Sequence, residues 1–170
     1  MEATIVAMST CLRIVTSDDA ESISALVQES FQKLAAADWD YKAQQIFIAN
    51  ASTESIAKAL QSAVYAASEF SDGHPTGFIL FPKPSLLGML FVNPNHIGQG
   101  IARRLWEAAR AHIESVYPDV KTIELNSTPY AVNIYRALGF VPISKEFVVD
   151  GCRATRMACW LRARSLGAET

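Results

Sequence analysis

The sequence predicts one α/β (mixed α+β) domain in which helices pack on a mixed β-sheet. Three observations predict this fold class. The chain has 170 residues, of which 50% are apolar, and this length and composition suit one domain with a conventional buried core. Some segments carry apolar residues at helical spacing, whereas others are short apolar runs bounded by turn residues. Along the chain the segments follow the order strand, helices, three strands, helix, strand, helix and two strands.

The first third of the domain is expected to contain one strand and three helices. Residues 12–15 form a short apolar run that is typical of a strand. Asp18 is expected to cap the first helix, with Glu21 at the capping-box position. Further helices are expected over residues 41–48 and 53–61. The apolar face of the first helix consists of Ile23, Leu26, Val27, Phe31 and Leu34.

The middle of the chain changes to a strand pattern. Residues 64–70 and 77–81 are strand-like and flank a turn that contains Asp72-Gly73. An Asp-Gly pair favours a tight reversal, so these two strands are predicted to form a hairpin. Residues 86–92 are apolar almost throughout, which predicts a central strand covered on both faces.

The last third continues with a long helix after a glycine-containing loop. Its apolar stripe consists of Ile101, Leu105, Ala108, Ala109, His112, Ile113 and Val116. Pro118 marks the end of this helix. A strand over residues 121–126, a helix over 129–138 and a hairpin made of 141–149 and 152–161 complete the expected elements.

Composition and charge exclude several classes of protein. The chain carries 15 basic and 17 acidic residues, a net charge of −2, which argues against nucleic-acid partners and a polybasic membrane anchor. Three scattered cysteines form neither a disulfide framework nor a metal-binding pair. No apolar run approaches the length of a membrane helix, and the first residues lack the features of a signal peptide. We therefore expect a cytoplasmic protein without metal, with a lead-in over residues 1–10, one domain over 11–162 and a tail over 163–170.

The most informative segment is Gly98-Gln99-Gly100, which follows the strand over residues 86–92 and opens the long helix. The first turn of a helix has unpartnered N–H groups and the positive end of the helix dipole. Glycine lets a ligand approach the backbone because it has no Cβ. This arrangement suits a phosphate or pyrophosphate, and Arg103 and Arg104 add positive charge nearby.

Three phosphate ligands compete for this loop, beside the plain interpretation of a loop that only starts a helix. A P-loop requires Gly-Lys-Ser/Thr at its end, which the chain lacks here. A dinucleotide fingerprint requires a third glycine where the chain has Arg103. The third candidate is the pyrophosphate of coenzyme A.

Two motifs resemble those of the GNAT superfamily of N-acetyltransferases. The family's loop is Gln/Arg-x-x-Gly-x-Gly/Ala, in which Gly100 and Ala102 take the last two fixed positions and Ile97 replaces the first. Downstream, residues 131–140, AVNIYRALGF, resemble the family's A-x-x-x-Y-x-x-x-G-F segment. The resemblance implies a GNAT-like acyl-CoA N-acyltransferase fold. In that fold the sheet splays after residues 86–92, and the acetyl-pantetheine arm of acetyl-CoA lies in the gap like an extra strand.

The resemblance also implies which residues hold acetyl-CoA, here a co-substrate. Backbone groups of Leu90 and Val92 would pair with the pantetheine arm, and the Leu90 N–H would stabilise charge on the thioester oxygen. Tyr135 would donate a proton to the departing sulfur. The expected coenzyme-binding residues are Leu90, Phe91, Val92, Gly98, Gln99, Gly100, Ile101, Ala102, Arg103 and Thr128.

Acetyl transfer also requires a base, because the attacking amine must be neutral. Glu124, on the strand that borders the expected gap, is the best candidate, and Glu69 is a weaker one, with a water chain open in either case. The amine is expected to bind between the first helices and the final hairpin. The aromatic residues expected to line that region are Trp39, Tyr41, Phe47 and Phe147.

The resemblance therefore implies an enzyme that moves an acetyl group from acetyl-CoA to a primary amine of a small molecule or protein, by direct transfer in a ternary complex. No cysteine lies in either motif, so an acetyl-cysteine intermediate is not favoured. The alternatives are a non-catalytic acyl-CoA-binding sensor on the same fold and an unrelated nucleotide-binding domain. The identity of the amine, the length of the acyl group and the oligomeric state, a homodimer included, stay open.

Overall fold

The structure is a computed structural model that describes residues 9–161. The expected tail over residues 163–170 and most of the lead-in over 1–10 lie outside these residues, and Thr10 already belongs to the first strand. In order, the elements are β1 (Thr10–Ile14), α1 (Ala20–Leu34), α2 (Tyr41–Asn50), α3 (Thr53–Ser62), β2 (Tyr65–Ser71), β3 (His74–Phe81), β4 (Met89–Val92), α4 (Ile101–Val116), β5 (Thr122–Ser127), α5 (Val132–Ala137), β6 (Val141–Pro142), β7 (Phe147–Val149) and β8 (Cys152–Trp160).

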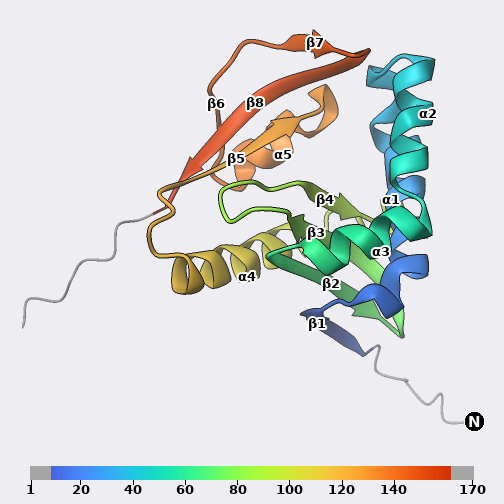
Figure 1. Cartoon of the computed structure of the whole chain (residues 1–170), viewed down its shortest axis with the longest axis vertical. Helices are drawn as coiled ribbons and strands as arrows, with labels where there is room; N and C mark the ends of the chain where they lie inside the picture. Colours follow the sequence, from blue (N-terminus) through green and yellow to red (C-terminus); the bar gives the residue numbers. More distant parts are fainter. Residues whose placement is uncertain (1–8, 162–170) are drawn as a thin grey trace, which may run out of the picture.

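The strands form two half-sheets, which Figure 1 shows diverging from one another. The first half-sheet has the antiparallel order β1-β2-β3-β4, and in the second β8 pairs with β5, β6 and β7. They meet at a parallel contact in which Leu87 N–H donates to Glu124 O (3.0 Å) and Glu124 N–H donates to Ser85 O (2.9 Å). Beyond this contact β4 and β5 are not paired within the described residues. The predicted splayed sheet is therefore confirmed.

Helices cover both faces of the first half-sheet, because alternate residues of its strands point to opposite sides. On one face α1 and α3 pack against Ala66, Phe70, Phe78 and Leu80. On the other face α4 packs against Ala67, Ile79 and Phe81, together with buried residues of β5, α5 and β8. Glu69 belongs to the β2 positions that alternate toward α4. No helix within residues 9–161 is long and apolar enough to cross a membrane.

The strand predicted over residues 86–92 is shorter and less buried than expected. β4 begins at Met89, and all four of its residues are partly exposed. The reason is topological: Leu86 and Leu87 pair with Glu124, and the free edge of β4 then faces open space instead of a neighbouring strand. The prediction that this strand is central is therefore wrong, because β4 is the free edge of its half-sheet; its alternate residues still pack against the core clusters on the two faces.

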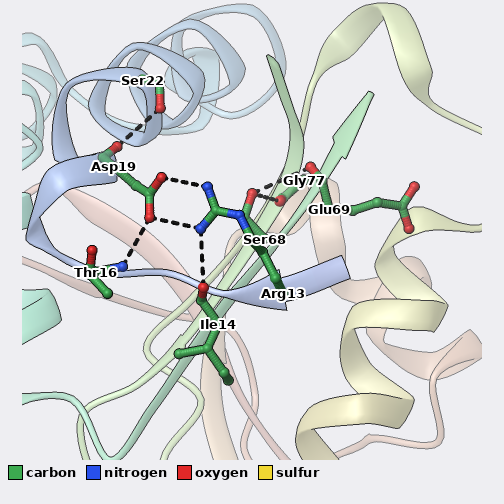
Figure 2. A network of polar contacts seen from close by, with 8 residues as sticks. All are labelled: Arg13, Ile14, Thr16, Asp19, Ser22, Ser68, Glu69 and Gly77. Carbon is green, nitrogen blue, oxygen red and sulfur yellow. Dashed lines mark hydrogen bonds and ion pairs between the residues drawn. The ribbon is translucent and has the colours of Figure 1, made fainter. Parts of the chain in front are cut away.

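The start of α1 also differs from the prediction that Asp18 caps it. A short 3₁₀ turn precedes the helix, and the Asp19 carboxylate accepts a hydrogen bond from Thr16 N–H (3.0 Å). Figure 2 shows that both terminal nitrogens of Arg13 donate hydrogen bonds to the same carboxylate (2.7 and 3.0 Å). These hydrogen bonds hold the pKa of Asp19 below its ordinary value. Figure 2 also shows Ser68 Oγ donating to Gly77 O across β2 and β3 (2.6 Å).

The strand predicted over residues 141–149 is divided into β6 and β7. The ladder with β8 continues past Pro142, because Ile143 N–H donates to Arg156 O (2.8 Å). Arg156 N–H then donates to Ser144 Oγ (3.0 Å) and not to a backbone carbonyl. A side chain thus replaces the ladder at this point, and the chain bulges between the two short strands.

Both predicted hairpins are present. The first turns at Asp72 and Gly73, whose positive φ values of 49° and 80° are those of a tight two-residue turn. The second joins β7 to β8 and reaches the connection between α1 and α2 (Figure 1), where Asp40 N–H donates to Gly151 O (3.1 Å). The final hairpin and the first helices therefore lie next to each other.

Candidate functional site

A cavity of about 680 Å³ opens where β4 and β5 part. One part of its wall comes from the start of α4 and from α5, and another part comes from α1 and α2. Because α1 and α4 cover opposite faces of the first half-sheet, the cavity passes through the gap between the half-sheets. We therefore call this cavity a passage between the half-sheets.

The free edge of β4 offers backbone groups to this cavity. Asn93 N–H donates to Thr76 O (2.8 Å), and the alternation of an antiparallel ladder then turns the backbone groups of Phe91 toward β3. The backbone groups of Leu90 and Val92 point the other way, into the gap. The Val92 carbonyl already accepts a hydrogen bond from Ser30 Oγ (3.0 Å). Phe91 lines the cavity as well, and its side chain belongs to the α1 face of the sheet.

The glycine loop has the backbone conformation that the predicted anion cradle requires, and we refer to Gly98–Arg103 as the anion cradle. Gly98 and Gly100 have φ values of +83° and +78°, which a residue with a Cβ rarely adopts. The first helical hydrogen bond of α4 runs from Arg104 N–H to Gly100 O (3.0 Å), so the N–H groups of the three preceding residues have no partner within the helix. Gly98, Gly100, Ile101, Ala102 and Arg103 all line the cavity, whereas Gln99 does not.

An ion pair between a buried carboxylate and a half-exposed arginine holds this loop on the side away from the cavity. The Glu69 side chain is only 4% exposed, and Arg104 donates to it from Nε (2.7 Å) and Nη2 (2.8 Å). The remaining nitrogen of Arg104, Nη1, donates to the carbonyl of Gln99 in the loop (2.8 Å). The Gln99 carbonyl thus faces Arg104, whereas the role expected for Gln99 concerns its backbone N–H and stays a prediction.

The same ion pair changes two other expectations. Glu69 is held by a bidentate contact, so it is not free to act as a base. Arg104 is neutralised by Glu69, and Arg103 is left as the arginine that lines the cavity. The Arg103 Nη2 donates to Ala137 O (2.9 Å), which ties the start of α4 to the end of α5.

Tyr135 lines the cavity from α5 and is 9% exposed. Its ring packs edge-on against Phe140, with 5.7 Å between the ring centroids. Burial raises the pKa of Tyr135 well above its ordinary value. The phenol thus stays protonated at neutral pH, the form that a proton donor requires.

Glu124 lies on β5, the strand that borders the gap, as predicted. Its side chain is exposed and does not line the cavity, and its backbone forms the contact at which the gap closes. Further along β5 the strand has left β4, and there Asn126 and the expected Thr128 do line the cavity. Sequence reasoning missed Asn126, although its position near the end of β5, two residues before Thr128, was a usable signal.

Two of the four aromatic residues expected to line the amine region line the cavity. Trp39 and Phe47 line the cavity, but Tyr41 is 76% exposed and, like Phe147, does not line it. Phe31 also contributes to the wall; helical spacing had assigned it to the core. His96, treated as structural in the sequence, lines the cavity too, and its buried Nδ1 has no hydrogen-bond partner within residues 9–161. In this part of the chain no group of three or more His, Cys, Asp or Glu side chains could hold a metal ion.

These features define an α/β protein with a splayed sheet and a cavity between two parting strands. Comparison with known proteins agrees. The family model described as "Acetyltransferase (GNAT) domain" matches residues 35–161. The chain therefore belongs to the GNAT acetyltransferase family. Among curated proteins, a search found no match.

Solved structures share the fold. A GCN5-related N-acetyltransferase from Rhodopseudomonas palustris superposes with a TM-score of 0.78 and 21% identity, over 92% of this chain and 99% of the other. The PaiA N-acetyltransferase from Thermoplasma acidophilum, solved with coenzyme A, has a TM-score of 0.73 and 18% identity, over 91% and 100%. The ribosomal-protein-S18-alanine N-acetyltransferase from Escherichia coli has a TM-score of 0.61 and 18% identity, over 95% and 100%.

Proposed function

We propose that this protein is an acetyl-CoA-dependent N-acetyltransferase that transfers the acetyl group directly to a primary amine in a ternary complex. The observation that carries the proposal is the passage between β4 and β5. It combines an anion cradle at the start of α4 with a protonated, buried Tyr135. Coenzyme A bound to a neighbour of the same fold supports the choice of ligand.

The residues of the passage suit acetyl-CoA in their chemistry. The free N–H groups around Gly98–Arg103 would bind the pyrophosphate, with Arg103 nearby. The backbone groups of Leu90 and Val92 would pair with the amides of the pantetheine arm, as one strand pairs with another. When bound, acetyl-CoA supplies an activated acetyl thioester.

The reaction joins the amine nitrogen to the acetyl carbon and breaks the carbon–sulfur bond. The Leu90 N–H would stabilise the negative charge that grows on the thioester oxygen, and Tyr135 would give its proton to the departing sulfur. A lysine-like amine is only about 0.1% neutral near pH 7.4, so a proton must leave before attack. Since Glu124 does not line the cavity, we propose that water takes this proton.

A ligand-binding assay followed by a turnover assay tests the proposal. A ligand at 100 times its Kd stabilises a protein by about 2.7 kcal/mol, so saturating acetyl-CoA is expected to raise the melting temperature. Acetyl-pantetheine, which lacks the pyrophosphate, is the matched control and should give a smaller shift at equal concentration. Acetylation of at least one amine in a panel of small amines and peptides should follow.

Two results would contradict the proposed function. A thermal shift with NAD but none with acetyl-CoA would favour an unrelated nucleotide-binding domain. A shift with acetyl-CoA but no acetylation of any amine would instead identify a non-catalytic acyl-CoA-binding module on the same fold.

A further inference from the structure

Beyond β4, four aromatic rings line the cavity where α1 and α2 close it; we name this part the aromatic end. It consists of Phe31, Trp39, Phe47 and Phe91. Phe31 stacks on Phe47 with 4.0 Å between centroids, and Trp39 meets both rings edge-on at 5.0 and 5.6 Å. Phe91 completes the group at 6.0 Å from Phe47. A flat apolar body fits such a wall, because rings favour stacked and edge-on contacts.

The cavity has no carboxylate in its lining, as far as residues 9–161 show. The two acidic residues beside Trp39 are engaged elsewhere. Asp38 accepts a hydrogen bond from Tyr130 N–H (3.2 Å) and lies 3.8 Å from Arg153. Asp40 caps α2 by accepting from Ala43 N–H (2.8 Å). A polycationic amine would thus lose water here without gaining a counter-charge, whereas an apolar wall favours the neutral form of a simple amine.

Trp39 adds one polar requirement to this apolar surface. Its Nε1 is buried and has no hydrogen-bond partner in the described part of the chain. The residue is held in place, since Trp39 N–H donates to Ala36 O (3.1 Å) and Gln44 Nε2 donates to Trp39 O (2.9 Å). Buried donors are rarely left unpaired. A ligand in the aromatic end that carries a hydrogen-bond-accepting atom would provide the missing partner.

We propose that the amine substrate is a primary amine carried on an aromatic ring system with one hydrogen-bond-accepting oxygen on or near the ring. This inference rests on the proposed function and names the substrate class of the same site. The ring stacks in the aromatic end, and the oxygen accepts a hydrogen bond from Trp39 Nε1. The amine nitrogen reaches the gap beside Leu90 and Tyr135.

The transfer balances with the groups present. The nitrogen–carbon bond forms as the carbon–sulfur bond breaks, water takes one proton from the amine, and the sulfur takes one from Tyr135, which solvent then restores. A longer acyl chain in the aromatic end is the competing occupant. It would leave the Trp39 N–H unpaired, because an alkyl chain has no acceptor atom.

The test measures kcat/KM with acetyl-CoA for tyramine, 2-phenylethylamine and spermidine at one pH. We expect kcat/KM for tyramine to exceed that for spermidine by at least about tenfold. It should exceed kcat/KM for 2-phenylethylamine by about two- to tenfold, the range for one neutral hydrogen bond. Trp39→Phe keeps a ring but removes the N–H, so the ratio of tyramine to 2-phenylethylamine should fall toward one while KM for acetyl-CoA stays unchanged. Trp160→Phe, at a tryptophan that is 59% exposed and outside the cavity lining, is the matched control and should keep the ratio.

A second variant keeps the test open if Trp39→Phe does not fold. Leu34 lines the cavity and is partly exposed. Leu34→Glu therefore introduces the missing carboxylate and should raise kcat/KM for spermidine relative to kcat/KM for tyramine. Wild-type preference for spermidine, or faster transfer from hexanoyl-CoA than from acetyl-CoA to tyramine, would overturn the inference and leave the proposed function standing. Acetyl-CoA binding without turnover of any amine would overturn the proposed function, and this inference with it.

Discussion

At the scale of single residues, Tyr135 carries the clearest chemical signature. Its side chain is buried against Phe140, lines the cavity, and has a pKa raised by that burial. A phenol with a raised pKa keeps its proton over the whole neutral range. It can therefore serve as a donor at any pH where the protein works, without first having to be protonated.

Replacing Tyr135 tests this role. Tyr135→Phe removes only the hydroxyl, and we expect kcat to fall by about 10²- to 10⁴-fold, the usual contribution of a positioned acid. Tyr130→Phe is the matched control, because Tyr130 also lines the cavity but is 41% exposed. Steady-state acetylation of one amine by the three proteins provides the comparison. Equal rates for Tyr135→Phe and the wild type would rule out the acid role.

Contacts between residues far apart in the sequence could not be predicted. The motif that contains Tyr135 is local, so its place in the cavity could be predicted. Glu69 and Arg104 are 35 residues apart, and no spacing rule joins a strand carboxylate to a particular arginine on a later helix. Glu69 was predicted as a candidate base and Arg104 as a positive charge near the anion. The fold instead pairs the two side chains with each other.

At the scale of elements, the position of the start of α4 determines the shape of the anion cradle. Two contacts set that position. The Arg104 guanidinium bridges Glu69 on β2 and the Gln99 carbonyl. Gly77 on β3 lets α4 approach closely, since a Cβ there would overlap the side chains of Ile101 and Leu105. The cradle is thus held by packing and by one ion pair, both outside the cavity.

The ion pair can be loosened without touching the cavity. Glu69→Gln keeps the size of the side chain but removes its charge, and we expect KM for acetyl-CoA to rise by about three- to tenfold with kcat nearly unchanged. This rise corresponds to about 0.7–1.4 kcal/mol, less than the ~1.5–3 kcal/mol of a hydrogen bond to a charged group, because Arg104 is half-exposed. The same substitution at Glu114, which pairs with Arg110 on α4, should change neither constant. A fall in kcat with KM preserved would show that Glu69 acts on the chemistry instead of on the loop.

Element types were more predictable than their surroundings. The two Asp-Gly turns and the long amphipathic helix follow from local residue patterns, and both appear as expected. The apolar run over residues 86–92 predicted a fully covered strand. Burial depends on what lies beside a strand, and here a gap lies beside β4. An apolar sequence does not show whether the edge of a strand pairs with another strand or borders a cavity.

At the scale of the whole molecule, buried phenols and thiols make the folded state sensitive to alkali. Burial raises the pKa of Tyr65, Tyr135, Cys152 and Cys159. A group whose pKa is raised by folding costs no stability below its ordinary pKa. Above that value the unfolded chain loses the proton while the folded chain keeps it, so the free energy of unfolding falls.

We therefore expect stability to decline as the pH rises above about 9, where thiols begin to ionise, and more steeply above about 10, where phenols do. Each fully buried group contributes a slope of about 1.4 kcal/mol per pH unit. Urea unfolding of the wild type and Tyr135→Phe between pH 7 and 11 measures this, and the variant should lose less stability above pH 10. Parallel profiles for the two proteins would contradict the assignment of a raised pKa to Tyr135.

The anion cradle of Gly98–Arg103 has a consequence for how such a protein changes over evolutionary time. Its donors are main-chain N–H groups, which every residue except proline possesses. Mutation can therefore replace most neighbouring side chains without removing these hydrogen-bond donors. Only the backbone path, marked here by the two left-handed glycines, has to survive. Chains of this fold can therefore differ in most of their side chains, as the identities of 21% and 18% with two solved structures of the same fold illustrate.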